Sequence, residues 1–256
     1  MSTGPAAPAA LATHGLSLTI GGARIVEDVT LAVAPGEFLG VIGPNGAGKT
    51  TLFNLLSGLS APTAGQVLLE TLDVTSWPAS RRAAAGLGRT FQTSSVFAGL
   101  PVLENVRLGA QARLGGGARL WRRASILRRT TETAQACLAR VGLSASARVL
   151  AGALAHGDKR KLELAILLAT DPRVILLDEP MAGVSSGDVP ELTALIRRVH
   201  REQGATVVMV EHHMDVVLGL ADRVAVMHHG RLLAVDEPAA VMADAHVQTA
   251  YLGEPL

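Results

Sequence analysis

The chain has 256 residues, of which 48% are hydrophobic, so it is long enough to bury a large core without disulfides or structural metal ions. With 23 basic and 22 acidic residues its formal net charge is +1, which argues against a nucleic-acid coat protein, since the domain of such a protein is normally strongly basic. The single cysteine, Cys137, excludes an internal disulfide and a cysteine-based zinc cluster, and fits a reducing compartment.

The N-terminal segment is rich in proline and alanine, and we expect residues 1–12 to form a flexible tail. Its first 13 residues contain no lysine or arginine and are interrupted by Pro5 and Pro8, so no signal peptide is expected there. No uninterrupted apolar run in the chain approaches the roughly 18 residues of a membrane-spanning helix. We therefore expect a cytoplasmic protein that reaches a membrane only through its partners.

Hydrophobic patterning predicts alternating strands and helices after the tail. Residues 16–20 and 24–33 alternate as strands around the Gly21-Gly22 turn. An apolar strand at 38–43 precedes a helix at about 48–58. The remaining strands are predicted at 66–69, 174–177, 206–210 and 223–227, and residues 100–156 are predicted to be helical. The last three strands are β-branched and leucine-rich without polar alternation, as expected for a parallel sheet buried on both faces.

The segment after the strand at 38–43 is typical of a phosphate-binding loop. It consists of Gly43, Pro44, Asn45, Gly46, Ala47, Gly48, Lys49 and Thr50. Small residues let the backbone wrap closely around a phosphate and direct N–H groups at it, and the following helix adds its positive N-terminus. Lys49 is placed to reach the β- and γ-phosphates of ATP and Thr50 to hold Mg²⁺. Thr51 either contacts the α-phosphate or is an ordinary residue of the first helical turn.

Two further strands also end in polar residues that can act chemically. Asp178-Glu179 follows the strand at 174–177, and Glu211-His212 follows the strand at 206–210. Ligands of open parallel sheets lie beyond the carboxyl ends of the strands, so these residues should meet the glycine loop at one edge. Asp178 is predicted to hold Mg²⁺ and Glu179 to activate water as a general base. An N-cap pair before a helix is the alternative for these two carboxylates.

Taken together, these motifs resemble the ATP-binding cassette (ABC) ATPases over about residues 14–254. Arg89-Thr90-Phe91-Gln92 resembles the glutamine loop of that family, which implies that Gln92 contacts Mg²⁺ or the attacking water. Glu211-His212 resembles the switch histidine, which implies that His212 contacts the γ-phosphate. A further stretch resembles the family signature and consists of Leu154, Ala155, His156, Gly157 and Asp158. In the family, this signature closes over the ATP of the partner subunit.

The resemblance implies an α/β fold with a P-loop NTPase core, a mixed and mainly parallel sheet, an N-terminal antiparallel β subdomain and an inserted α-helical subdomain. A single domain would span 13–256, with the nucleotide-binding core and β subdomain at 13–91 and 157–256 and the helical subdomain at 92–156. It also implies hydrolysis of ATP in a two-subunit sandwich. Thr50, Gln92 and Asp178 would organise Mg²⁺, and the catalytic residues would be Lys49, Gln92, Glu179 and His212.

One branch of the family is most similar, the ATPases of branched-chain amino-acid importers, whose close relatives serve urea or short amides. The similar stretches are 43–54, 89–92, 162–165 and 250–254. This branch implies a homodimer, or a heterodimer with a second ABC ATPase, at the cytoplasmic face of the inner membrane. The other implied partners are two membrane permease subunits and, indirectly, an extracellular solute-binding protein; no nucleic acid is implied.

Three positions depart from the wider family pattern. Ile20 stands where many members have an aromatic residue that stacks on adenine, and Ala155 replaces the usual signature serine. Ser185-Ser186 replaces the usual acidic or amide residue and proline of the dimer-contacting loop at 182–186. The changes at Ile20 and in this loop motivate a second hypothesis, a nucleotide-gated scaffold with little turnover. ABC ATPases of DNA repair or translation fit less well, because the chain lacks a coiled-coil insertion, zinc modules and a second cassette.

An arginine-rich stretch separates Glu104 from Glu132 and contains no acidic residue. Its basic residues are Arg107, Arg113, Arg119, Arg122, Arg123, Arg128 and Arg129. One hypothesis is that this stretch faces anionic lipids or acidic groups of a membrane partner. The alternative is a solvated helix face.

Overall fold

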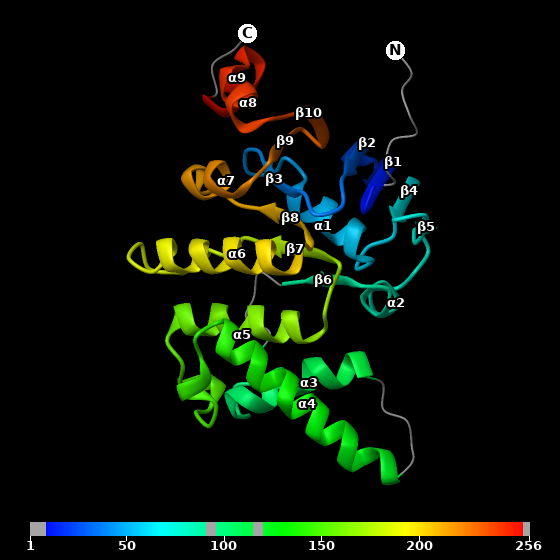
Figure 1. Cartoon of the computed structure of the whole chain (residues 1–256). Coiled ribbons are helices and arrows are strands. Elements are labelled where there is room, and N and C mark those ends of the chain that lie inside the picture. The colour runs from blue at the N-terminus through cyan, green and yellow to red at the C-terminus, as the bar shows by residue number, and fades with distance from the viewer. Residues whose placement is uncertain (1–8, 91–95, 115–119, 253–256) are drawn as a thin grey trace, which may run out of the picture. The chain divides into compact units, whose positions relative to one another are not determined.

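The computed structural model describes residues 9–90, 96–114 and 120–252 (Figure 1). Its contacts divide the chain into two compact units. The first, which we call the sheet unit, comprises Met1–Leu87, Arg173–Glu179 and His200–Leu256. The second, the helical unit, comprises Gly88–Pro172 and Pro180–Val199.

The sheet unit contains an antiparallel sheet of four strands in the order β2-β1-β4-β5. These strands are β1 (Leu11–Ile20), β2 (Ala23–Val33), β4 (Ala64–Leu69) and β5 (Leu72–Asp73). β1 begins five residues before the predicted start at residue 16, so Leu11 and Ala12, expected in the tail, belong to the strand. Leu11 is buried because it pairs with Val33 on one side and Leu69 on the other.

The second sheet has the order β10-β9-β3-β8-β7-β6. Its strands are β3 (Phe38–Ile42), β6 (Leu87–Arg89), β7 (Val174–Asp178), β8 (Thr206–Val210), β9 (Arg223–His228) and β10 (Arg231–Asp236). β3 pairs in parallel with β8 and β9, and β7 pairs in parallel with β8, whereas β10 is antiparallel to β9. Every residue of β7 and β8 is buried, as the absence of polar alternation predicted, and in β9 only the terminal Arg223 and His228 are half-buried. Every residue of β3 is buried as well. The predicted α/β fold with a mixed, mainly parallel sheet is confirmed.

The helices of the sheet unit follow the strand ends. They are α1 (Lys49–Ser57), α2 (Ala79–Ala84), α7 (Met214–Leu220), α8 (Pro238–Ala243) and α9 (Ala245–Leu252). α1 inserts Leu52, Phe53 and Leu56 into the hydrophobic core that the two sheets share. Because α1 starts directly after the glycine loop, this packing fixes the position of the loop.

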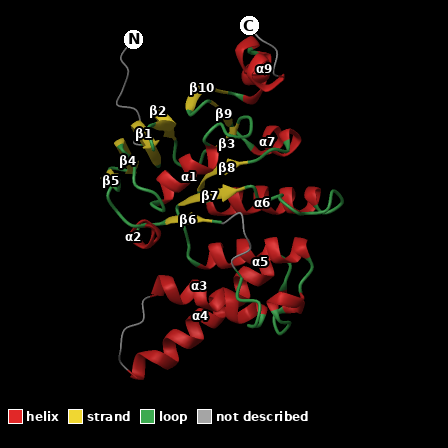
Figure 2. Cartoon of the chain, turned by 180° about the vertical axis from the view of Figure 1, so that it is seen from behind, coloured by secondary structure: helices red, strands yellow, loops and turns green. Residues whose placement is uncertain are grey.

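The helical unit contains α3 (Val102–Leu114), α4 (Leu120–Arg140), α5 (His156–Ala169) and most of α6 (Val189–Gln203). Figure 2 shows α3, α4 and α5 lying beside one another, and all three pairs are in contact. α5 belongs to this unit because it packs on α3 and α4. None of the helices within the described residues has the length and apolarity needed to cross a membrane.

The end of α1 depends on one buried arginine. Arg82 has an exposed fraction of only 1%, and its guanidinium donates hydrogen bonds to the carbonyls of Leu55, Leu56, Thr75 and Trp77 at 2.6 to 3.1 Å. Burial lowers the pKa of this side chain. Arg82 thus provides donors for carbonyls at the C-terminus of α1, where a helix has no intrahelical partners.

We predict that Arg82→Met lowers the free energy of unfolding by about 3–5 kcal/mol, because it leaves several buried carbonyls without a donor. Urea-induced unfolding followed by circular dichroism measures this change. Arg81→Met is the control, since Arg81 is exposed and only stacks on Trp77, with its guanidinium carbon 3.8 Å from the ring centroid. The control should cost less than about 1 kcal/mol; equal losses in the two variants would contradict the role given to Arg82.

Candidate nucleotide-binding site

The glycine loop lies where the sequence predicted it, between the end of β3 at Ile42 and the start of α1 at Lys49. It passes very close to the neighbouring strand β9. A Cβ on Gly43 would stand 2.2 Å from the carbonyl oxygen of Met227, so only glycine fits there. The turn after β9 also supports the loop, since the N–H of Gly230 donates to the carbonyl of Ala47.

Lys49 is buried within the loop that precedes it. Its Nζ donates to the carbonyls of Gly43 at 2.6 Å and Pro44 at 3.0 Å. Burial lowers the pKa of Lys49, and the negative charge of Glu179 acts in the opposite direction. Thr50, in the first turn of α1, is exposed and Thr51 is half-buried, so both hydroxyls lie at the helix start beside the loop.

The two predicted carboxylates lie at the end of β7. Asp178 is its last residue and is 1% exposed, and Glu179 follows with a φ of 48°. The N–H of Glu179 donates to the carbonyl of Val210, the last residue of β8, at 2.9 Å. This bond holds a left-handed backbone that is strained for a residue other than glycine, asparagine or aspartate.

His212 follows β8 and lies against Glu179. Its Nε2 is 3.0 Å from the Oε1 of Glu179. The intervening turn is shaped by Glu211, whose buried carboxylate accepts the N–H groups of His212 at 2.8 Å and His213 at 3.2 Å. Sequence reasoning gave Glu211 no role of its own. An acidic residue directly after the apolar run at 206–210 and before two histidines is the sequence signal that could have identified it as the residue that shapes the turn.

Strand order therefore brings most of the predicted site residues together in the sheet unit. β8 lies between β3 and β7, so the glycine loop, the Asp178-Glu179 pair and His212 follow three adjacent parallel strands.

Gln92, the third predicted Mg²⁺ ligand beside Thr50 and Asp178, lies outside the described residues. Among the residues that the structure does describe, no three His, Cys, Asp or Glu side chains gather as a metal site. One buried carboxylate and one hydroxyl nevertheless fit Mg²⁺, which keeps several waters and is usually completed by substrate phosphates.

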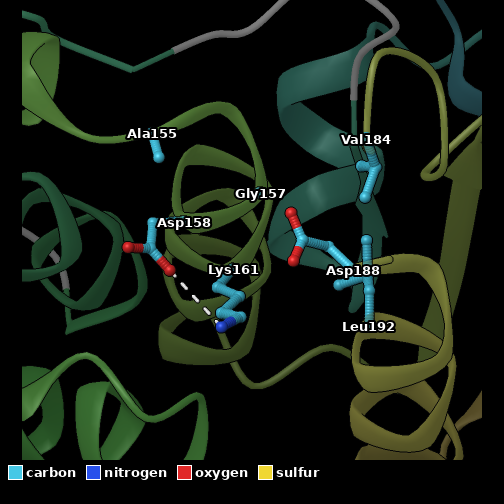
Figure 3. Close-up of a pocket in the computed structure, with 7 residues that line it drawn as sticks. All are labelled: Ala155, Gly157, Asp158, Lys161, Val184, Asp188 and Leu192. Carbon is cyan, nitrogen blue, oxygen red and sulfur yellow. Dashed lines mark ion pairs between the residues drawn. The ribbon is translucent and has the colours of Figure 1, made fainter. Parts of the chain in front are cut away.

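The predicted signature lies in the helical unit, at the start of α5. Leu154 is buried, Ala155 precedes the first turn, and His156 to Asp158 form that turn. Burial lowers the pKa of Lys161, one turn further on, but its hydrogen bonds to Glu191 and Asp158 outweigh burial and raise it. A cavity of about 170 Å³ lies beside this helix start. Figure 3 shows the residues that line it, which are Ala155, Gly157, Asp158, Lys161, Val184, Asp188 and Leu192. The signature thus lies beside the loop at 182–186 that was expected to contact a second subunit.

Ile20 is the last residue of β1, and 61% of it is exposed. A side chain so accessible can contact a ligand, but it offers no aromatic ring for an adenine base to stack on.

Comparison with known proteins agrees with this arrangement. Residues 26–182 match the family described as ABC transporter. The chain is 37% identical over 249 residues to the high-affinity branched-chain amino acid transport ATP-binding protein LivG of Escherichia coli (strain K12), covering 95% of this chain and 98% of LivG. It is 36% identical to the lipopolysaccharide export system ATP-binding protein LptB of Acidithiobacillus ferridurans, covering 90% and 91%. The crystal structure of the ADP conformation of MJ1267, an ATP-binding cassette of an ABC transporter, superposes with a TM-score of 0.82 at 28% identity, covering 96% and 99%.

We predict that Lys49→Met weakens ATP binding at least about tenfold, because it removes the buried ammonium that lies inside the loop. Isothermal titration calorimetry at constant ionic strength measures the affinity. Arg201→Met, which removes an exposed cation of α6, is the control and should leave the affinity unchanged. Equal affinity of Lys49→Met and the wild type would remove Lys49 from the binding site.

Proposed function

Because this chain belongs to the ABC transporter family, we propose that it is the motor subunit of an importer for branched-chain amino acids. It is an ATP-binding subunit of an ABC transporter, and its reaction is the hydrolysis of ATP coupled to transport. The observation that carries the proposed mechanism is the meeting of Lys49, Asp178, Glu179 and His212 beyond three adjacent strands. The similarity to LivG over almost the whole chain supports the class of solute.

Lys49 and the loop amides of Gly46 to Thr50 hold the β- and γ-phosphates in this proposal. Thr50 and Asp178 supply the protein oxygen ligands of Mg²⁺, together with Gln92. Held by these residues, Mg²⁺ would neutralise charge on the phosphates. Positioning and electrostatics account for most of the rate of phosphoryl transfer. Asp178 suits this role because its carboxylate is buried at a strand end and therefore has a fixed position.

Glu179 acts as the general base that polarises the attacking water. Its backbone is held by Val210 and its carboxylate by His212, so the oxygen that accepts the proton has a defined position. His212 contacts the γ-phosphate in the proposed reaction. Its proximity to Glu179 means that the imidazole can exchange a carboxylate partner for a phosphate partner when ATP is present. This pair favours hydrolysis over the scaffold hypothesis.

A second ABC ATPase, identical or different, completes each site in this proposal. Leu154 to Asp158 act on the nucleotide of the opposite subunit, where the N–H groups of the first turn of α5 can meet the γ-phosphate. Two membrane permease subunits and an extracellular solute-binding protein complete the importer, with the chain bound at the cytoplasmic face of the inner membrane. Urea or a short amide is the alternative solute, and the similarity to LptB makes lipopolysaccharide export a further candidate.

The arginine-rich stretch fits a solvated helix face where its side chains are described. Arg107 pairs with Glu104, Arg113 with Asp171 at 2.5 Å, and Arg128 with Glu132 at 3.4 Å. These carboxylates offset charge that would otherwise attract an anionic surface. Arg119 and the side chains of Arg122 and Arg123 lie outside the described residues, so membrane contact there stays a hypothesis.

We predict that Glu179→Gln binds ATP with near-normal affinity but hydrolyses it about 10²–10⁴-fold more slowly, as expected on loss of a general base. Phosphate release measures turnover, and calorimetry measures binding. Glu70→Gln is a matched control, because Glu70 also has a left-handed φ of 54° but pairs with Arg173 on the surface. Turnover of Glu179→Gln near that of the control would assign the base to another residue.

The solute is tested by uptake in cells that lack this gene. We predict that their uptake of radiolabelled leucine falls and returns with the wild-type gene but not with Glu179→Gln, while urea uptake is unaffected. Loss of urea uptake with normal leucine uptake would favour the amide branch. Normal uptake of both solutes together with a defect in the outer leaflet would favour lipopolysaccharide export.

A further inference from the structure

We propose that Arg160 is a positioning residue that ties the signature helix α5 to the loop that leaves Glu179. The inference deepens the proposed function and rests on it. Arg160 lies on the second turn of α5, and its side chain is only 7% exposed. One guanidinium nitrogen is 2.8 Å from the Oε2 of Glu163 on the same helix, and the other donates to the carbonyl of Ala182 at 3.1 Å.

Stability alone does not account for this pair. The side chain of Glu163 is only 9% exposed, so two charges are removed from water. A buried ion pair of this kind is often no more stable than two apolar side chains of similar volume. What the pair provides is geometry, since the planar guanidinium presents one nitrogen to the carboxylate and a second nitrogen, at a fixed angle, to the carbonyl. Lysine has a single nitrogen at the end of a flexible side chain, and methionine has no donor.

The loop meets the start of α5 at Gly183, which lies so close to the ring of His156 that a Cβ there would stand 2.6 Å from its Nε2. The cavity of about 170 Å³ is lined by Gly157 and Lys161 on α5, by Ala155 just before it, and by Val184 and Asp188 opposite (Figure 3). Next to it, the loop is shaped by a hydrogen bond of 2.7 Å from Ser185 Oγ to Asp188, which is internal to the loop. Lys161 reaches across to Glu191, but that residue belongs to α6. The bond from Arg160 to Ala182 is a direct hydrogen bond from α5 to the backbone of the loop, one residue before the contact of Gly183 with His156.

Ala182, whose carbonyl accepts the bond from Arg160, lies close in sequence to the proposed general base Glu179. Only Pro180 and the buried Met181 separate Ala182 from Glu179. A shift of α5 that pulls on Ala182 reaches the backbone of Glu179 through two residues, one of which is a proline with a fixed φ. Arg160 thus couples the position of the signature helix to the position of the base. It contacts no nucleotide in this scheme and acts through the carbonyl of Ala182.

The test measures kcat and KM for ATP in two variants of the full chain. Arg160→Met/Glu163→Met replaces both buried charges by apolar groups and removes the tie to Ala182. Arg160→Lys keeps a positive charge beside Glu163 but removes the second guanidinium nitrogen, which donates to the carbonyl of Ala182. In both variants we expect kcat to fall about tenfold, as for a misplaced catalytic group, with KM within about twofold of the wild type. Arg198→Met is the control, because it removes another arginine-to-carbonyl bond of the helical unit, from Arg198 to Arg140, and should leave kcat unchanged.

Thermal unfolding separates positioning from stability. Both variants should melt within about 4 °C of the wild type, and if the methionine pair does not, the lysine variant decides. A wild-type kcat in a stably folded variant overturns the inference and leaves the proposed function intact. Absence of hydrolysis by the wild-type chain, in contrast, overturns the proposed function, and with it the role of Arg160.

Discussion

The close approach of backbone to backbone at the end of β3 is the constraint on which the rest of the site depends. The carbonyl of Met227 occupies the space that a side chain at Gly43 would need. That contact, with the bond from Gly230 to Ala47, holds the loop against β9 while α1 is anchored in the core. The backbone amides of the loop are thereby fixed without a ligand, so in the proposed site phosphate binding does not have to order them.

Charge balance in the sheet unit follows from the same arrangement. Burial lowers the pKa of Lys49, while the carboxylate of Glu179 favours its charged form. A triphosphate brings further negative charge to this ammonium, so phosphate binding and the protonation of Lys49 stabilise each other. The same negative charge would repel Asp178 and Glu179, which explains why a divalent cation belongs in the proposed reaction.

The predictions that agree with the structure came from local sequence patterns. The features that were not predicted depend on contacts between residues distant in sequence. Glycine spacing, an acidic pair after an apolar run and a histidine after another each identify a strand end without knowledge of the fold. The start of β1 does not, because Leu11 is a strand residue only through its pairing with Val33 and Leu69, which overrides a proline- and alanine-rich context. The ties from Arg82 to Leu55 and from Arg160 to Ala182 join residues that no sequence pattern links.

The proposed base, Glu179, has a strained backbone and is the last residue of the sheet unit before the chain enters the helical unit. The chain leaves the sheet unit after Glu179 and enters the helical unit at Pro180. A left-handed φ before a proline is unfavourable, and strain of this kind costs on the order of 1–3 kcal/mol. It persists because the bond to Val210 fixes one side of the junction and the tie from Arg160 fixes Ala182 on the other. The backbone of Glu179 is thus held by a bond within the sheet unit, and the loop that follows it is held by a bond within the helical unit.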